Sequence, residues 1–179
     1  MIRLIAPTTD LHTSWLEAVD EFDGGQPHGF GFSYGILPWS RESLSTPEGF
    51  ADFVETRNQW SVPGSPMPDG LVNDSIFWIV DDTEPDRVLG SLSLRHELND
   101  FLLNAGGHIG YGVRPSARGR GVATAALIAA LDEARALGLD RVLVSCDADN
   151  EASRRTIVRG GGVLEDTREG IERYWIDLT

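Results

Sequence analysis

The feature that most constrains this chain is residues 113–124, where an apolar segment ends and two glycines precede a helix-forming sequence. Gly119 and Gly121 allow positive φ angles and a close approach of the backbone to a ligand. The first N–H groups of a helix have no partner within it, and the helix dipole is positive at that end. With Arg118 and Arg120 alongside, the segment predicts a site for a phosphate-like anion. The alternative is a turn that binds nothing.

The charge distribution supports the same interpretation. The formal net charge of the 179 residues is −13, which argues against a nucleic-acid or anionic-membrane surface. Residues 1–105 hold 5 Arg and 17 acidic residues, whereas residues 106–164 hold 8 Arg and 6 acidic residues. An Arg-bearing segment inside an acidic chain indicates that an anion is bound there, although a chance imbalance of solvated surfaces would look the same.

Residue types that are absent or rare exclude several function classes. All 15 basic residues are Arg, so a Walker-type phosphate loop, a protein-kinase site and a pyridoxal Schiff base, which each need a lysine, are excluded. The single cysteine permits no internal disulfide. His12 and His28 lie too far apart, with too few cysteines, to predict a metal site. With no apolar run of membrane-spanning length and no signal peptide, we expect a cytoplasmic protein.

Hydrophobic periodicity and punctuation by Gly and Pro predict an α+β fold with one mixed sheet. Helices are expected at residues 11–22, from 47 to about 60, at 122–137 and at 151–159. Strands are expected at residues 2–5, 75–80, 88–95, 108–113, 141–145 and 173–178. The three strands from 75 to 113 form an antiparallel meander, and the strand at 141–145 lies parallel to the third of them if the crossover is right-handed. The length of 179 residues fits one domain spanning residues 1–179.

Two motifs resemble those of a known superfamily. Arg118-x-x-Gly121-x-Ala123, placed between a strand and a helix, resembles the [Gln/Arg]-x-x-Gly-x-[Gly/Ala] motif of the GNAT acyl-CoA N-acyltransferases. Asn150-Glu151-Ala152-Ser153 is similar to the Asn-x-x-[Ala/Ser] segment after the fifth strand of that superfamily. Residues 76–112 also resemble an uncharacterised branch of predicted acetyltransferases. The resemblance to the superfamily is strong over residues 75–178. Over the first 70 residues it is limited to the order of helices and strands.

The resemblance implies a three-layer α/β/α fold with a splayed sheet and acyl-CoA, most often acetyl-CoA, between its fourth and fifth strands. The pyrophosphate would lie on backbone N–H groups of residues 118–124, the pantetheine along residues 111–113, and an adenosine phosphate near Arg155 or Arg159. The implied cofactor-binding residues are Tyr111, Gly112, Val113, Arg118, Gly119, Arg120, Gly121, Val122, Ala123, Thr124, Asn150, Ser153 and Arg155. For Asn150 the alternative is a helix cap.

Acyl transfer to a primary amine in a ternary complex needs a neutral amine, a stabilised thioester oxygen and a proton for the leaving thiolate. Many family members carry a Tyr seven residues after the Asn as general acid, but this chain has Ile157 there. Tyr174 is the substitute, with a half-buried strand position as its alternative. Candidate bases are His108 and, at the end of the preceding strand, Glu97 or His96. Strand alternation places His108 on the face opposite Tyr111 unless a bulge intervenes.

The acceptor amine is not identified by the sequence, and a small molecule and a peptide amine both remain open. The loops at residues 23–45 and 61–74 and the first two helices are expected to shape its pocket. They carry, among other aromatic residues, Trp39, Trp60, Phe30, Phe32 and Tyr34. Without the family tyrosine, a catalytically silent acyl-CoA-binding sensor or partner module is the alternative function. A homodimer is the default oligomeric expectation.

Overall fold

A seven-stranded mixed sheet forms the centre of the structure, in the strand order β1-β2-β3-β4-β5-β7-β6. The computed structural model describes residues 1–25, 27–32 and 37–179. The strands are β1 (Ile2–Ile5), β2 (Asp74–Asp81), β3 (Gly90–Arg95), β4 (Ile109–Val113), β5 (Arg141–Asp147), β6 (Val163–Arg168) and β7 (Ile171–Asp177). The strands β2, β3 and β4 form the expected antiparallel meander, and β4 and β5 are parallel.

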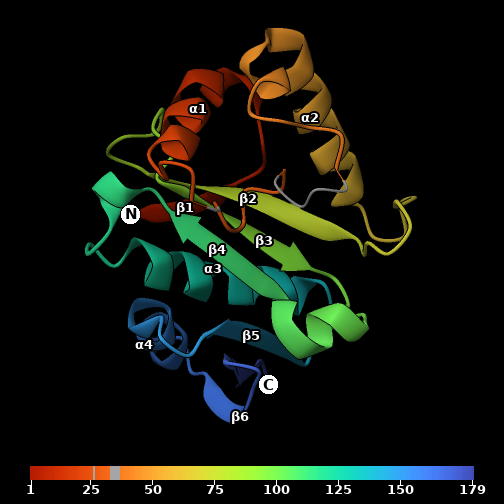
Figure 1. Ribbon diagram of the computed structural model, residues 1–179, viewed down its shortest axis with the longest axis vertical. Helices are drawn as coiled ribbons and strands as arrows, with labels where there is room; N and C mark the ends of the chain where they lie inside the picture. The colour runs from red at the N-terminus through yellow and green to blue at the C-terminus, as the bar shows by residue number, and fades with distance from the viewer. Residues whose placement is uncertain (26, 33–36) are drawn as a thin grey trace.

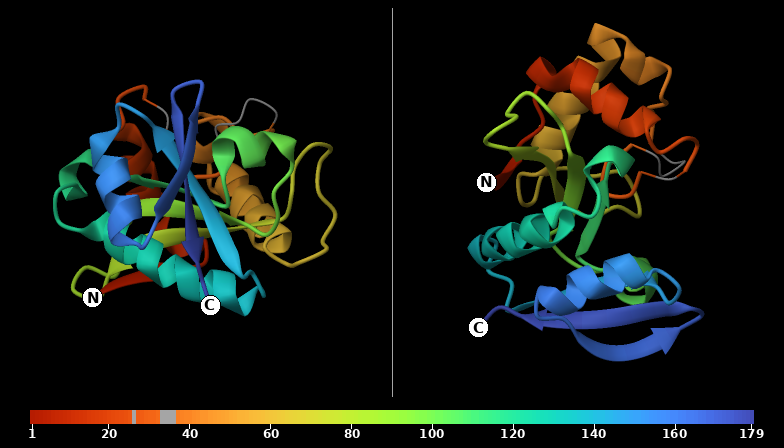
Figure 2. Two further views of the ribbon diagram at one scale, coloured as in Figure 1. Left: turned by 90° about the horizontal axis from the view of Figure 1, so that it is seen from below. Right: turned by 90° about the vertical axis from the view of Figure 1, so that its left-hand side faces the viewer.

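Helices cover both faces of the sheet. The helices α1 (His12–Asp20) and α2 (Pro47–Trp60) lie on one side, and α3 (Val122–Ala136) and α4 (Glu151–Arg159) lie on the other (Figure 1). In the right-hand view of Figure 2, α3 and α4 lie between β4 and the C-terminal strands β5–β7, because the sheet bends around these two helices. The predicted α/β/α arrangement with a mixed sheet is therefore confirmed. In the described part of the chain, no helix has the length and apolar composition that a membrane span requires.

Strand alternation sends the side chains of β2 into two separate hydrophobic clusters. Ile76 and Trp78 pack with the aromatic residues of α1 and α2, around the fully buried Trp15. Ile79 points to the opposite side and packs with α3 and the central strands. Because alternate side chains of a strand point to opposite faces, this one strand packs against the helices on both sides of the sheet.

Local signals define the ends of the helices well. The hydroxyl of Thr46 accepts a hydrogen bond from the N–H of Gly49 (3.1 Å), and Pro47 occupies the first turn, so α2 begins where the sequence predicts. The first helix is shorter than expected, because a 3₁₀ turn (Thr9–Leu11) precedes α1 and the helix ends at Asp20.

The sequence does not predict the strand β6 or a π-helical segment before β4. The strand β6 is an edge strand whose residues are almost all exposed, so it shows no alternation between a buried and a solvated face. Glu169 (φ 48°) and Gly170 (φ 81°) form the tight turn that joins it to β7. A π-helical segment (Leu102–Gly106) precedes β4.

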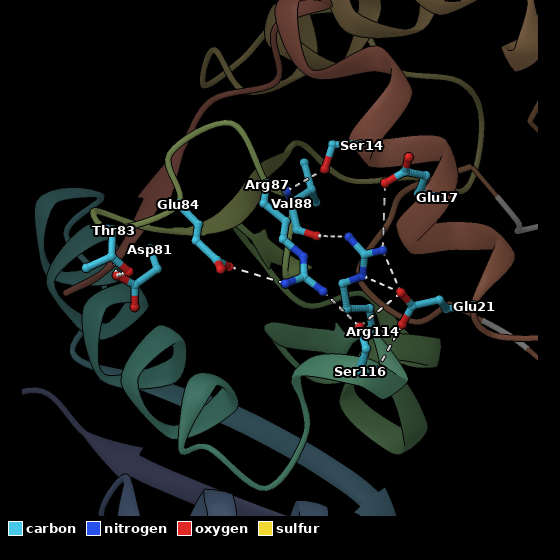
Figure 3. Close-up of polar contacts among 10 residues, drawn as sticks. All are labelled: Ser14, Glu17, Glu21, Asp81, Thr83, Glu84, Arg87, Val88, Arg114 and Ser116. Carbon is cyan, nitrogen blue, oxygen red and sulfur yellow. Dashed lines mark hydrogen bonds and ion pairs between the residues drawn. The ribbon is translucent and has the colours of Figure 1, made fainter.

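An ion pair fastens the end of α1 to the residues that follow β4 (Figure 3). The guanidinium of Arg114, which is 4% exposed, donates to Glu21 Oε1 from Nε (2.8 Å) and Nη2 (2.5 Å), and from Nη1 to the carbonyl of Val88 (3.1 Å). Glu21 also accepts hydrogen bonds from the backbone N–H and the hydroxyl of Ser116, each 2.9 Å long. Residues 118–121, which contain Gly119 and Gly121, form the glycine loop. Because Ser116 lies just before this loop, its contact with Glu21 holds the loop against the first helix.

The Glu21–Arg114 contact should make stability depend on pH in acid. The hydrogen bonds from Arg114 lower the pKa of Glu21 to about 2, so its contribution is present above the ordinary pKa of about 4.3 and is lost as pH falls from about 5 to about 2. We predict that Glu21→Gln lowers the free energy of unfolding at pH 7 by about 1–3 kcal/mol and flattens its dependence on pH in that range. Urea unfolding at several pH values measures both effects. Glu133→Gln, at an exposed position of α3, is the control, and equal acid sensitivity of Glu21→Gln and the unmodified chain would contradict the assignment.

Candidate functional site

A cavity of about 710 Å³ lies where β4 and β5 separate. Its walls come from the loop after α1, the end of β4, the glycine loop with the first turn of α3, and α4. The lining residues are Phe22, Gly25, His28, Tyr111, Gly112, Val113, Ala117, Arg118, Gly119, Gly121, Val122, Ala123, Thr124, Asn150, Ala152, Ser153, Arg155, Thr156 and Arg159. Twelve of the thirteen predicted cofactor-binding residues are among them, and the exception is the exposed Arg120.

The separation of the two strands creates the slot. The strands β4 and β5 pair only at Ile109 and Val144, whereas the other edge of β5 pairs with β7 along its whole length. Figure 2 shows β5, β6 and β7 turning away from the other four strands. The backbone of residues 111–113 therefore faces the cavity on the side where a neighbouring strand would otherwise lie. An extended ligand could form hydrogen bonds with this free strand edge.

The N-terminal end of α3, which opens onto the cavity and is called the mouth of α3 below, has the geometry of an anion site. Gly119 (φ 74°) and Gly121 (φ 77°) adopt left-handed backbone conformations, and a Cβ at either position would meet no atom within 4 Å. Gly121 is the N-cap and supplies no side chain to the first helical N–H groups, which leaves them available to an anion. Both glycines are thus needed for their conformation and leave space beside the backbone.

Three Arg side chains surround this mouth. Arg118 Nε donates to the carbonyl of Val113 (2.9 Å), and its guanidinium lies over the ring of Phe22, 5.5 Å from the centroid. Arg155 and Arg159 line the opposite wall from α4, where Arg155 pairs with Glu151 (3.1 Å). The cavity is therefore positively charged near the glycine loop.

Two hydroxyl groups meet across the inner part of the cavity. The Tyr111 hydroxyl of β4 and Ser153 Oγ of α4 are 2.8 Å apart and share a hydrogen bond. Burial raises the pKa of Tyr111 to about 12, so the phenol keeps its proton at neutral pH. Asn150 also acts as a helix cap, since its Oδ1 accepts a hydrogen bond from the N–H of Ser153 (3.1 Å).

None of the three predicted catalytic side chains lines the cavity. His108 is 6% exposed, and its Nδ1 accepts a hydrogen bond from the N–H of Leu143 (2.9 Å), which places the ring proton on Nε2. Burial, assisted by the nearby charges of Arg95 and Arg141, lowers the pKa of His108 to about 4. The imidazole is thus neutral at physiological pH but is engaged with the backbone of β5.

The other candidate acid and base side chains also lie outside the cavity lining. Glu97 is exposed just after β3, and His96 shares a hydrogen bond between its Nε2 and the hydroxyl of Ser75 (2.9 Å). The Tyr174 hydroxyl donates to Glu172 Oε2 (2.7 Å), and burial raises the pKa of this phenol to about 12. Ile157, at the position of the family tyrosine, is fully buried in the core.

Sequence reasoning did not assign Phe22, Gly25, His28, Ala117, Ala152 and Thr156 to the cavity. The first three come from a segment some 85 residues before β4, and no local spacing links them to the glycine loop. The aromatic residues expected at an acceptor pocket are buried in the cluster around Trp15, namely Trp39, Trp60, Phe30 and Phe32, and Tyr34 lies outside the described residues. In the described ranges, no three His, Cys, Asp or Glu side chains form a group that could hold a metal ion.

Comparisons with known proteins agree with this geometry. The family model of the acetyltransferase (GNAT) domain matches residues 30–163. No curated protein sequence matches the chain. Solved acetyltransferase structures are similar in fold over nearly the whole chain.

Three structures with bound ligands illustrate this similarity. RimL, a ribosomal L7/L12 alpha-N-protein acetyltransferase in complex with coenzyme A, is 19% identical, with a TM-score of 0.64 and coverage of 99% of this chain and 96% of that chain. RimJ of Mycobacterium smegmatis, in complex with CoA-disulfide, is 18% identical, with a TM-score of 0.68 and coverage of 98% and 81%. The microcin C7 self-immunity acetyltransferase MccE, in complex with acetyl-CoA and AMP, is 18% identical, with a TM-score of 0.63 and coverage of 98% and 92%. At these identities the similarity establishes the fold.

The environment of His108 should be visible in its titration. We predict that its ring protons titrate in NMR spectra with a midpoint near pH 4, well below the ordinary value of about 6.5. Because the folded state binds this proton more weakly than the unfolded chain, the free energy of unfolding should decrease as pH falls from about 6.5 to about 4. His108→Gln assigns the signal, and a midpoint above pH 6 would contradict a buried imidazole.

Proposed function

The chain belongs to the GNAT acetyltransferase family, and from this premise we propose that it transfers an acetyl group from acetyl-CoA to a primary amine in a ternary complex. The proposal takes residues 1–179 as one acetyltransferase domain. The observation that supports it best is the single cavity that joins the strand separation to the glycine-lined mouth of α3. A slot for an extended chain next to a site for anions suits the pantetheine and pyrophosphate of coenzyme A.

The lining residues fit each part of the cofactor. The N–H groups of Val122, Ala123 and Thr124 would hold the pyrophosphate, with Arg118 beside them. The backbone of residues 111–113 would pair with the pantetheine amides, and Asn150 and Ser153 would line its other side. Arg155 and Arg159, which line the opposite wall, would meet an adenosine phosphate. With no lysine in the chain, recognition of the phosphates rests on backbone amides and Arg.

The transfer forms one bond and breaks another. The neutral amine nitrogen bonds to the thioester carbonyl carbon, the C–S bond breaks, the nitrogen loses a proton to water, and the thiolate of coenzyme A gains one. A backbone N–H group of residues 111–113 would stabilise the developing negative charge on the carbonyl oxygen. Among the described residues, Tyr111 is the phenol that lines the cavity, and its hydroxyl shares a hydrogen bond with Ser153. We assign to this hydroxyl the proton donated to the thiolate, and water then returns a proton to the phenolate.

A peptide N-terminus and a small amine both remain acceptor classes under this proposal. The ribosomal-protein acetyltransferases among the similar structures support the first class.

Binding of coenzyme A should depend on the open space beside Gly121. We predict that Gly121→Leu weakens binding by about 100-fold or more, because the side chain enters the space next to the α3 N–H groups. Gly64→Leu is a matched control, since Gly64 (φ 80°) has the same backbone conformation and also has no atom near its Cβ position, yet does not line the cavity. Titration calorimetry with coenzyme A measures both variants against the unmodified chain. Equal affinities of Gly121→Leu and Gly64→Leu would refute the loop assignment.

Turnover distinguishes an enzyme from a silent acyl-CoA-binding module. With a panel of amines and acetyl-CoA, we predict amine-dependent release of thiol, measured with a colorimetric thiol reagent. Tyr111→Phe should lower kcat by about 100-fold with little change in the KM for acetyl-CoA, as expected for loss of a proton donor.

Tyr174→Phe is the control, because it removes a phenol that bonds to Glu172 and does not line the cavity. Equal effects of the two substitutions would contradict the role of Tyr111. Binding of acetyl-CoA without thiol release across the panel would favour the silent module.

A further inference from the structure

One histidine of the chain lines the cofactor cavity. His28 lies at an exposed position in the segment after α1 and forms part of the cavity wall. The other three histidines are engaged outside that wall. His12 Nε2 donates to the carbonyl of Leu44 (2.8 Å), and the rings of His96 and His108 make the contacts described above. Among the described residues, His28 is therefore the imidazole that faces the proposed reaction centre.

The cavity wall offers few side chains that can accept a proton. In the described part of the chain, no Asp or Glu lines it. Arg118, Arg155 and Arg159 are permanent cations, which donate hydrogen bonds and accept none. Tyr111 keeps its proton at neutral pH, because burial raises its pKa to about 12. An imidazole exchanges a proton between about pH 5 and 8, so His28 is the side chain of this wall that suits the role of a base.

A tight turn holds His28 in place. The N–H of Phe30 donates to the carbonyl of Pro27 (3.3 Å), and Gly29 has the positive φ (79°) that the third residue of a type II turn requires. A Cβ at Gly29 would lie 2.6 Å from the carbonyl oxygen of Ser91 in β3, so the turn rests directly on the sheet. Ser91 Oγ also donates to the carbonyl of Gly29 (2.8 Å). The backbone that carries His28 is thus fixed on the central strands.

His28 and Tyr111 approach β4 from opposite faces of the sheet. A Cβ at Gly112 would lie 2.5 Å from the carbonyl oxygen of His28, so residue 112 faces the turn. Side chains alternate along a strand, and the Tyr111 side chain therefore points to the other face, where its hydroxyl meets Ser153 of α4. The helices α1 and α4 lie on opposite sides of β4 (Figure 1). This arrangement separates a proton acceptor from a proton donor, which amine attack and thiolate departure need at different atoms.

We propose that His28 is the base that takes a proton from the ammonium form of the acceptor, which approaches the thioester from the face of the sheet that carries α1 and α2. This inference rests on the proposed acetyltransferase function and adds a catalytic residue to it.

The proton transfer precedes the attack. A primary amine is mostly an ammonium ion at neutral pH, and its nitrogen has no free electron pair. A ring nitrogen of the neutral imidazole bonds to one ammonium proton, the N–H bond breaks, and its electron pair stays on the amine nitrogen for attack on the carbonyl carbon. The imidazolium then returns its proton to water, which reaches the exposed side chain.

The pH dependence of turnover in His28→Gln tests the proposal. With the amine of the panel that supports the fastest thiol release, we expect kcat/KM at pH 7 to fall about 100-fold. The variant must use amine that is already neutral in solution, and this fraction grows about tenfold per pH unit below the pKa of the amine. The deficit should therefore shrink as the pH rises toward that pKa. A deficit of the same size at every pH, or no deficit, would overturn the proposal.

His96→Gln is the matched control. It makes the same change at a histidine that does not line the cavity, and the new amide can keep a hydrogen bond to Ser75. We expect its kcat/KM to stay within about twofold of the unmodified chain at each pH, as is usual away from a reacting group. Equal effects of His28→Gln and His96→Gln would contradict a catalytic role of His28.

Calorimetric titration with coenzyme A separates catalysis from cofactor binding. His28→Gln should bind coenzyme A with the affinity of the unmodified chain, because the proposed contact is with the acceptor. A loss as large as that in Gly121→Leu would place His28 in the cofactor site and overturn the proposal. Thiol release that His28→Gln leaves unaltered would refute the base alone. Absence of thiol release from the unmodified chain with every amine would contradict the proposed function itself.

Discussion

The short pairing between β4 and β5 is the constraint on which the rest of the structure depends. The strand β5 pairs with β4 at Ile109 and Val144 and with β7 along its whole length. Three strands therefore turn away as a unit, and the edge of β4 is left facing a cavity. The glycine loop and α3 follow directly from that edge, so the strand separation and the anion site are joined by the chain itself.

The first helix takes part in the same arrangement from the other side of the sheet. Glu21 binds Arg114 and Ser116, at the point where β4 leads into the loop. Phe22, the next residue along the chain, lies under the guanidinium of Arg118. The loop that we assign to the phosphates is thus held by the segment that leads to residues 25 and 28 of the same cavity. Loss of the Glu21 contact would affect the shape of the cofactor site as well as stability.

The sequence predicts well those features whose signals are local. Thr46 and Pro47 define the start of α2, and Gly119 and Gly121 define the loop before α3, because capping and positive φ act on neighbouring residues. The edge strand β6 was missed since its side chains are solvated on both faces and leave no periodic pattern. The contributions of Phe22 and His28 to the cavity depend on contacts across the sheet, which no spacing in the sequence encodes.

The catalytic side chains were the least predictable part of the site. His108 was selected for its titration range, yet the N–H of Leu143 and burial beside Trp175 engage it away from the cavity. Tyr174 lies in the last strand, as the sequence predicts, and its hydroxyl donates to Glu172. Tyr111 was assigned only a backbone role from sequence, because nothing local indicates that its hydroxyl reaches Ser153 on a helix 42 residues later. Proton-transfer roles follow from three-dimensional placement, whereas the anion site follows from a contiguous motif.

The most direct test of this account is a crystal structure of the protein with coenzyme A. The account predicts the pyrophosphate within hydrogen-bonding distance of the N–H groups of Val122–Thr124, and the pantetheine between β4 and β5 with its sulfur near Tyr111. Coenzyme A bound outside the strand separation, or a pyrophosphate away from the mouth of α3, would contradict it.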